Sequence, residues 1–189
     1  MCVGGTPYNK ANKGNQVNDD GRVWVGGLAL RINPDGTGLD VTAHNFRNNY
    51  ETGIDSYGNL WQNDNDDQVV ACRTSFVMEG ANAGYFSTDG TRYWQADQHP
   101  GQSIPTAHWH QQDPGVMPVG DITGAGSPTG VAVHEGDALG EAYRGTLLSA
   151  KAGRNVIFSY KLMPKGAGYD LSNRRDFIST FPQVNADYK

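Results

Sequence analysis

The sequence is poor in cysteine and in clustered positive charge. Cys2 and Cys72 are the 2 cysteines of 189 residues, too few and too far apart for a metal knuckle, and the sequence leaves open whether they are free thiols or one disulfide. Asp and Glu (20) outnumber Lys and Arg (15), for a net charge of -5. Because phosphate binding needs grouped basic residues, and no basic run exceeds the pair Arg174 and Arg175, we expect no nucleic-acid partner.

Targeting segments and common haem and zinc motifs are not found in this sequence either. Residues 1–7 contain no basic region followed by an apolar stretch, so we expect neither a signal peptide nor a membrane span within this chain. If the parent protein is exported, its signal lies outside this chain. The C-x-x-C-H haem motif and the H-E-x-x-H zinc motif do not occur.

What the sequence does have is glycine and proline at regular intervals. The 25 Gly and 9 Pro indicate many short elements joined by tight turns. With 37% hydrophobic residues, the chain has enough apolar surface for a core. We therefore expect one all-β domain over residues 1–189, with an irregular segment at 1–20 and a loop-rich insertion at 80–128.

Two strand–turn–strand units follow one another between Arg22 and Asp67. Strands are expected at 28–32, 39–46, 52–55 and 60–63, with turns at 33–36 and 56–59. In the first turn Pro34 pre-sets a backbone dihedral and Gly36 tolerates positive φ. Several antiparallel strands within about forty residues are typical of one propeller blade.

The same phrases recur further along the chain. Residues 30–36 are echoed by 160–166, and 52–54 by 129–131. The two Pro-x-Gly turns lie 130 residues apart (164 minus 34), which is about three blades at roughly 40 to 45 residues each. The repeats favour a propeller over a generic β-sandwich.

Three groups of donors and aromatic side chains are candidates for binding. Arg47 and Asn48 end a strand and present a bidentate donor beside an amide, which suits carboxylates or quinone oxygens, although a capped turn with a surface arginine also explains them. Lys151 ends another strand and can donate to an anionic cofactor. If residues 107–113 form a strand, His108 and His110 face the same side, as channel-lining residues or as a structural pair, with Trp109 toward the core or a sugar.

An acidic run at 63–67 follows the strand at 60–63. Five oxygen-bearing side chains in a row are what a hard cation such as calcium prefers. The run lacks the spacing of an EF-hand, and ordinary Asx turns are an equally simple explanation.

Taken in order, these phrases resemble one family. Residues 30–39, then 46–48, 53–55 and 58–61, resemble the blade of pyrroloquinoline-quinone (PQQ)-dependent glucose/sorbosone dehydrogenases that carries their Arg-Asn cofactor contact. Residues 79–85 and 127–148 resemble later parts of the same propeller. Residues 45–51, 61–67 and 108–116 resemble large secreted proteins of planctomycete-type bacteria, membrane-bound dehydrogenases or haem-binding-domain proteins.

The resemblance implies a fold, a cofactor and a compartment. The fold is a partial β-propeller, about three to four blades of a six-bladed one with long loops, and the location is periplasmic or extracellular. It implies that Arg47, Asn48 and Lys151 contact PQQ, and that calcium lies near Asn65 and Asp66. The partners would be a sugar or polyol substrate and a cytochrome c electron acceptor on the parent or on another chain.

The same resemblance leaves catalysis by this chain open. The family base is a histidine on an earlier blade, no residue here matches it, and His44 does not take its place. The expected function is therefore a fragment of a quinoprotein sugar or alcohol dehydrogenase, incomplete on its own. The alternatives are a non-catalytic propeller that binds glycans or a protein partner through residues 80–128, and a structural remnant.

Overall fold

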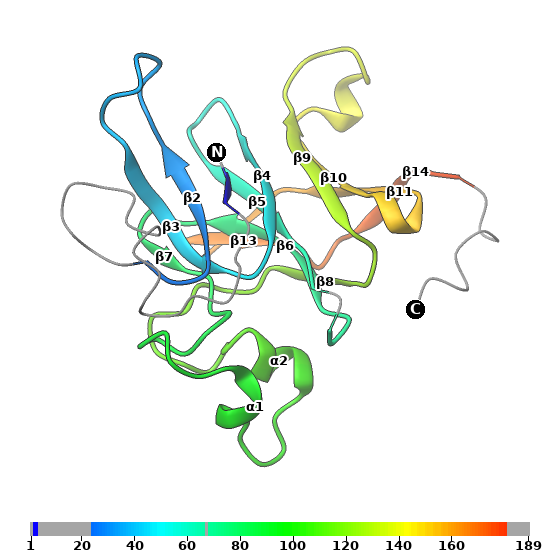
Figure 1. Ribbon diagram of the computed structural model, residues 1–189. Coiled ribbons are helices and arrows are strands. Elements are labelled where there is room, and N and C mark those ends of the chain that lie inside the picture. The colour runs from blue at the N-terminus through cyan, green and yellow to red at the C-terminus, as the bar shows by residue number, and fades with distance from the viewer. Residues whose placement is uncertain (1, 4–23, 67, 181–189) are drawn as a thin grey trace.

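The computed structural model describes residues 2–3, 24–66 and 68–180. Over these residues the chain consists mostly of short strands, with two short α-helices. Three four-stranded sheets and one two-stranded sheet hold the strands, and Figure 1 shows the larger sheets side by side. The expected all-β class with long loops is confirmed.

The first sheet has the strand order β1-β2-β3-β7. Its members are β1 (Cys2–Val3), β2 (Gly27–Arg31), β3 (Asp40–Phe46) and β7 (Ala81–Asn82). The turn between β2 and β3 forms as expected, because the Gly36 N–H donates to the Asn33 carbonyl at 2.9 Å and Gly36 adopts φ +85°.

The second sheet has the order β4-β5-β6-β8. Its members are β4 (Asn49–Ile54), β5 (Leu60–Asp64), β6 (Cys72–Val77) and β8 (Asp121–Gly124). The Asp55 carboxylate accepts hydrogen bonds from the N–H groups of Tyr57 and Asn59, an Asx turn that fixes the β4–β5 hairpin. Both expected strand–turn–strand units are therefore present.

The third sheet has the order β14-β11-β10-β9. Along the chain, a separate two-stranded hairpin lies between β11 and β14. Its members are β9 (Pro128–His134), β10 (Thr146–Lys151), β11 (Val156–Lys161) and β14 (Arg175–Ser179), and the hairpin is β12 (Met163–Lys165) with β13 (Gly168–Asp170). Short 3-10 turns, η2 (Glu141–Tyr143) and η3 (Ala152–Arg154), precede and follow β10.

Edge strands β4 and β9 bring the second and third sheets together. A Cβ on Gly53 would lie 2.5 Å from the Val131 carbonyl oxygen, so a larger residue there would collide with the neighbouring backbone. The repeated Thr-Gly phrase, at Gly53 and again at Gly130, lies in these two strands. Successive sheets that meet at corresponding strands are the arrangement of propeller blades, so the expected partial propeller is confirmed.

The repeat spacing needs one correction. The two Pro-x-Gly turns follow β2 in the first sheet and β11 in the third, so their offset covers two sheets rather than about three blades. Residues 83–120, which connect β7 to β8, account for much of the extra length.

Separate apolar clusters fill the spaces between the sheets. Phe46, Val77 and Met117 belong to one cluster, and Trp61 and Leu147 belong to the cluster between the second and third sheets. All five side chains are almost fully buried. The blades are therefore joined by packing as well as by the chain.

Residues 83–120 form a compact extension at one end of the sheets, at the bottom of Figure 1. It contains α1 (Trp94–Asp97) and α2 (Ile104–His108). The segment expected to be a loop-rich insertion, 80–128, thus also includes β7, β8 and the first residue of β9. Of the segment expected to be irregular, 1–20, only β1 lies among the described residues.

Candidate functional site

Three of the connections singled out in the sequence lie at the same end of the sheets. Adjacent strands in the second and third sheets are antiparallel, so the end of one strand lies beside the start of its neighbour. The connection from β3 to β4 carries Arg47 and Asn48, the connection from β5 to β6 carries Asn65 and Asp66, and Lys151 ends β10. The extension that holds His108 packs against this end.

Asp64, the last residue of β5, fixes the backbone at Arg47 and Asn48. Its carboxylate accepts the Asn48 N–H at 2.7 Å and the Arg47 N–H at 3.2 Å. It also pairs with the Arg73 guanidinium at 3.0 Å, and the two side chains are 2% and 0% exposed. The turn that presents Arg47 is therefore tied to a buried ion pair.

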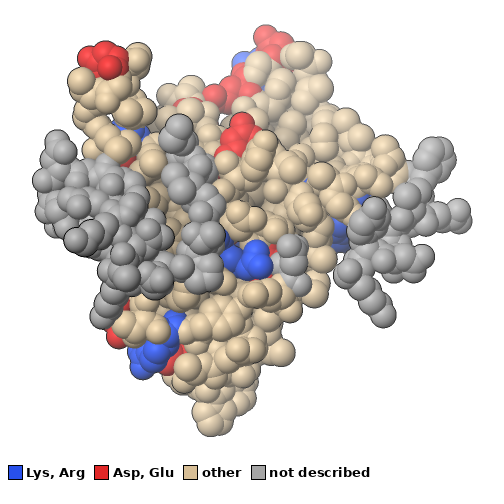
Figure 2. All heavy atoms as spheres, in the orientation of Figure 1, with Lys and Arg blue, Asp and Glu red and all other residues tan. Residues whose placement is uncertain are grey.

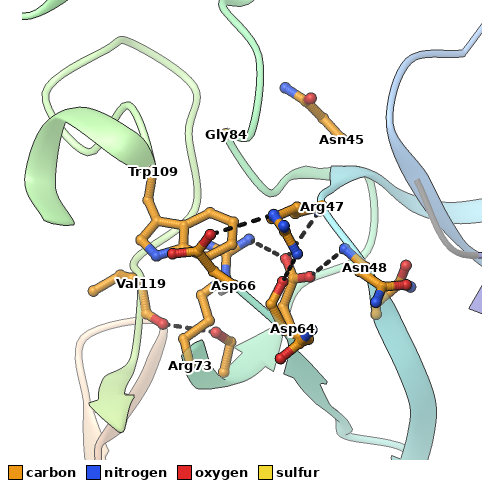
Figure 3. A network of polar contacts seen from close by, with 12 residues as sticks. Asn45, Arg47, Asn48, Asp64, Asp66, Arg73, Gly84, Trp109 and Val119 are labelled. Atoms are coloured by element: carbon orange, nitrogen blue, oxygen red, sulfur yellow. Dashed lines mark hydrogen bonds and ion pairs between the residues drawn. The ribbon is translucent and has the colours of Figure 1, made fainter. Parts of the chain in front are cut away.

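Asp66 binds the side chain of Arg47. The Arg47 Nε lies 3.3 Å from the Asp66 carboxylate, and the Arg47 Nη1 donates to the Asn65 carbonyl at 2.8 Å. Figure 3 shows Arg47, Asp64, Asp66 and Arg73 turned toward one another. Two acids and two arginines balance one another in this cluster, and the Arg47 side chain keeps 15% of its surface exposed.

His108, Trp109 and His110 do not form a strand, so the expected same-side arrangement of the two histidines is wrong. His108 ends α2, Trp109 is its C-cap, and His110 adopts φ +43°. The reason is local: Pro105 lies in the first turn of the helix, and the Ser103 side chain accepts the Thr106 N–H, a capping arrangement that favours helix over strand.

These three residues are core residues in this structure. They are 0%, 0% and 2% exposed, and the Trp109 ring stacks on the Arg73 guanidinium at 3.7 Å. The His108 Nε2 lies 3.5 Å from the Asp66 carboxylate, whereas the His110 Nδ1 bonds to the Gly84 carbonyl at 2.8 Å. Burial lowers the pKa of His108 to about 4, against the opposing charge of Asp66, so the imidazole adds no charge to the cluster at neutral pH. Lining of a substrate channel by these residues stays a prediction.

Lys151 lies between the second and third sheets rather than beside Arg47. Its ammonium donates to the Asn63 side-chain oxygen at 3.2 Å and to the Thr74 hydroxyl at 3.1 Å. The residue is 1% exposed, and within the described ranges no acid forms an ion pair with it. Burial lowers the pKa of Lys151 to about 7, because the charged form has lost most of its solvent.

This buried lysine predicts a pH dependence of stability. Between pH about 7, its pKa in the folded chain, and its ordinary value of 10.5, the unfolded chain binds more protons, so the free energy of unfolding rises with pH. The rise is up to about 1.4 kcal/mol per pH unit for one group. We expect Lys151→Met to remove this rise from urea-unfolding profiles, whereas Lys165→Met, at a mostly exposed lysine, should keep it. Equal slopes in the wild type and Lys151→Met would contradict the assignment.

The oxygens of Asn65 and Asp66 are poorly suited to calcium. The Asp66 carboxylate accepts the N–H groups of Gln68, Val69 and Ala71 besides facing Arg47. The carbonyl of Asn65 accepts from Arg47, and that of Asp66 accepts from the thiol of Cys72 at 3.3 Å. The donor set therefore does not fit a cation, contrary to the calcium site that the resemblance implies.

The remaining residues around the site are a histidine, the cysteines and an ion pair that the sequence did not predict. His44 packs its ring against Trp24, with 5.1 Å between centroids, and burial lowers its pKa. Cys72 is buried, and the side chain of Cys2 lies outside the described residues. In the sequence, Asp64 stood out only as part of the acidic run at 63–67, and Arg73 did not stand out at all. Arg73 could have been found only by pairing β5 with β6, which places it opposite Asp64.

The surface shows no large basic patch on the face in view, as expected from the lack of basic runs in the sequence. On the face in Figure 2, Lys and Arg form small separate groups, and most of the surface is neither acidic nor basic. No described helix has both the length and the apolar character needed to cross a membrane.

Fold and site together define a segment of β-propeller with a buried arginine–aspartate cluster at one end of its blades. The chain belongs to the family described as a domain of unknown function, DUF7133, whose model matches residues 5–181. No curated protein matches the chain.

Solved structures with a similar fold include sugar dehydrogenases. The PQQ-bound aldose sugar dehydrogenase of Streptomyces coelicolor is 17% identical, with a TM-score of 0.53 over 80% of this chain and 39% of its own. A putative oxidoreductase (glucose dehydrogenase) of Thermus thermophilus is 14% identical, with a TM-score of 0.51 over 75% of this chain and 36% of its own. A glucose dehydrogenase is 16% identical, with a TM-score of 0.50 over 77% of this chain and 39% of its own. At these identities the likeness shows the fold, and this chain spans about two fifths of the length of such structures.

Proposed function

We propose that this chain supplies the quinone-facing part of a PQQ-dependent sugar or alcohol dehydrogenase propeller. The observation that carries the proposal is the Arg47–Asn48 turn. It lies at the end of the blades, Asp64 fixes its backbone, and it leaves 15% of the Arg47 side chain and the Asn48 amide exposed. The fold shared with a PQQ-bound dehydrogenase supports the same assignment.

The available donors suit a ligand with carboxylates and quinone oxygens. Arg47 presents a planar set of N–H donors, and Asn48 presents an amide, with no side-chain bond of Asn48 among the described residues. Lys151 is a buried amine whose hydrogen-bond partners are neutral, so a nearby anion would stabilise its charged form. Arg47 and Asn48 fit as direct contacts, and Lys151 fits as a nearby positive charge, because it bonds to Asn63, the residue before Asp64 in β5.

The chemistry divides between the cofactor, this chain and the rest of the enzyme. When bound, PQQ supplies a hydride acceptor for oxidation of a hydroxyl group. Arg47 would hold a quinone oxygen and stabilise negative charge that develops there. Proton removal from a sugar or polyol is left to a base outside this chain. We assign the electron acceptor to a cytochrome c and the compartment to the periplasm or the exterior, on the resemblance to the dehydrogenase family.

Titration of PQQ into the purified chain tests the proposal. We expect saturable quenching of tryptophan fluorescence with a shift in quinone absorbance, and a Kd at least about tenfold weaker in Arg47→Ala, equivalent to about 1.4 kcal/mol. Arg31→Ala is the matched control, because Arg31 pairs with Asp40 at the opposite end of the first sheet and is 61% exposed. It should bind like the wild type.

Two outcomes would overturn this function. One is the absence of saturable binding by the wild type, and the other is an unchanged Kd in Arg47→Ala. Retention of the chain on a carbohydrate matrix together with the first outcome would favour the non-catalytic, glycan-binding alternative.

A further inference from the structure

The loop that follows β5 is built around one buried carboxylate. Asp66 is 0% exposed. One of its oxygens accepts the Gln68 N–H at 3.1 Å, and the other accepts the N–H groups of Val69 and Ala71, both at 3.2 Å. Three backbone donors therefore fix the position of this carboxylate, much as a side chain caps a turn.

The counter-charge of this carboxylate is a guanidinium. Arg47 places its Nε 3.3 Å from Asp66 and its Nη1 2.8 Å from the Asn65 carbonyl. The two residues that would present oxygens to a divalent cation thus present them to Arg47. The His108 Nε2 lies 3.5 Å from the same carboxylate and is fully buried, so this side of Asp66 is also covered.

The electrostatics of the neighbourhood favour the guanidinium over a metal ion. Asp64 pairs with Arg73 and Asp66 pairs with Arg47, so the buried charges already cancel. A divalent cation at Asp66 would add two positive charges beside two arginines, at a cost that buried surroundings make large.

We infer that Asp66 is a positioning residue for Arg47, and that the Arg47 guanidinium takes the place of a divalent cation in the loop after β5. Held at Nε by Asp66 and at Nη1 by Asn65, the guanidinium has one orientation, with 15% of its side-chain surface exposed to a ligand. The positioning of Arg47 for quinone binding rests on the function proposed above. The assignment of Arg47 as the counter-charge of Asp66 does not.

Calcium titration tests the counter-charge without any quinone. Calcium chloride is titrated into the chelator-treated chain to about 1 mM, the weak end of the range for protein calcium sites, by calorimetry and by thermal unfolding. We expect no saturable heat and an unchanged Tm, since a ligand that does not bind the folded chain does not stabilise it. Saturable calcium binding that Asp66→Asn abolishes and Asp40→Asn preserves would overturn the inference.

A double-mutant cycle tests the positioning role. We expect Asp66→Asn to weaken PQQ binding about tenfold in the wild-type background but less than about twofold in the Arg47→Met background, because the two residues act as one unit. A structural role alone predicts the same loss in both backgrounds, and that result would refute positioning. If the wild type does not bind PQQ, the proposed function fails while the calcium result still decides the counter-charge. If Asp66→Asn does not fold, as judged by near-UV circular dichroism, calcium titration of the unmodified chain decides it.

Discussion

Replacement of Asp64 with alanine should lower the free energy of unfolding by about 3–5 kcal/mol, the usual cost of breaking a buried ion pair. The variant leaves the Arg73 guanidinium buried at 0% exposure without its counter-ion. It also removes the acceptor for the N–H groups of Arg47 and Asn48. Urea unfolding followed by tryptophan fluorescence measures the loss.

Asp55 provides the matched control for this prediction. Its carboxylate also fixes a turn, through the N–H groups of Tyr57 and Asn59, but no described arginine or lysine pairs with it. Asp55→Ala should cost only about 1–3 kcal/mol, the cost of unsatisfied donors. An Asp64→Ala loss no larger than that of Asp55→Ala would mean that the Arg73 pair does not stabilise the fold.

Replacement of Trp109 with alanine should cost about 3–5 kcal/mol as well, as expected for a large aromatic side chain in a core. The ring is 0% exposed, its Nε1–H donates to the Ala71 carbonyl at 2.9 Å, and it covers the Arg73 guanidinium. The change would remove both contacts and open the space between the extension and the second sheet. Thermal and urea unfolding both measure the effect.

The conservative variant separates packing from hydrogen bonding at this position. Trp109→Phe keeps an aromatic face for Arg73 and loses the bond to Ala71, so we expect about 1–3 kcal/mol. If Trp109 instead lined an open substrate channel, Trp109→Ala would change stability by less than about 0.5 kcal/mol. That result would contradict the core placement.

The strands and turns of the first two sheets could be predicted because their signals are local. Pro34 and Gly36 specify a turn whatever lies around them, and the Asp55 turn is likewise set by neighbouring residues. The repeated phrase with Gly53 and Gly130 predicted corresponding strands, since both glycines occur where the edge strands β4 and β9 approach each other. The count of blades between repeats was wrong, because an insertion such as 83–120 changes spacing without changing the blade pattern.

Only part of the candidate site could be predicted from the sequence. Arg47, Asn65 and Asp66 stood out as polar residues after strands, and the structure brings them together. Arg73 did not stand out, because its pairing with Asp64 depends on the register of β5 and β6. The helix that buries His108 had a readable signal in Ser103 and Pro105, whereas its docking against Asp66 depends on tertiary packing alone.

The central claim is that the end of the blades with Arg47 and Asn48 faces a quinone. Amide and side-chain chemical shifts of the labelled chain, recorded during a PQQ titration, test it most directly. The account predicts shifts concentrated at Arg47, Asn48 and residues 63–66, with little change at the opposite turns around Gly36 and Gly58. Shifts confined to those opposite turns, or no shifts at saturating quinone, would contradict it.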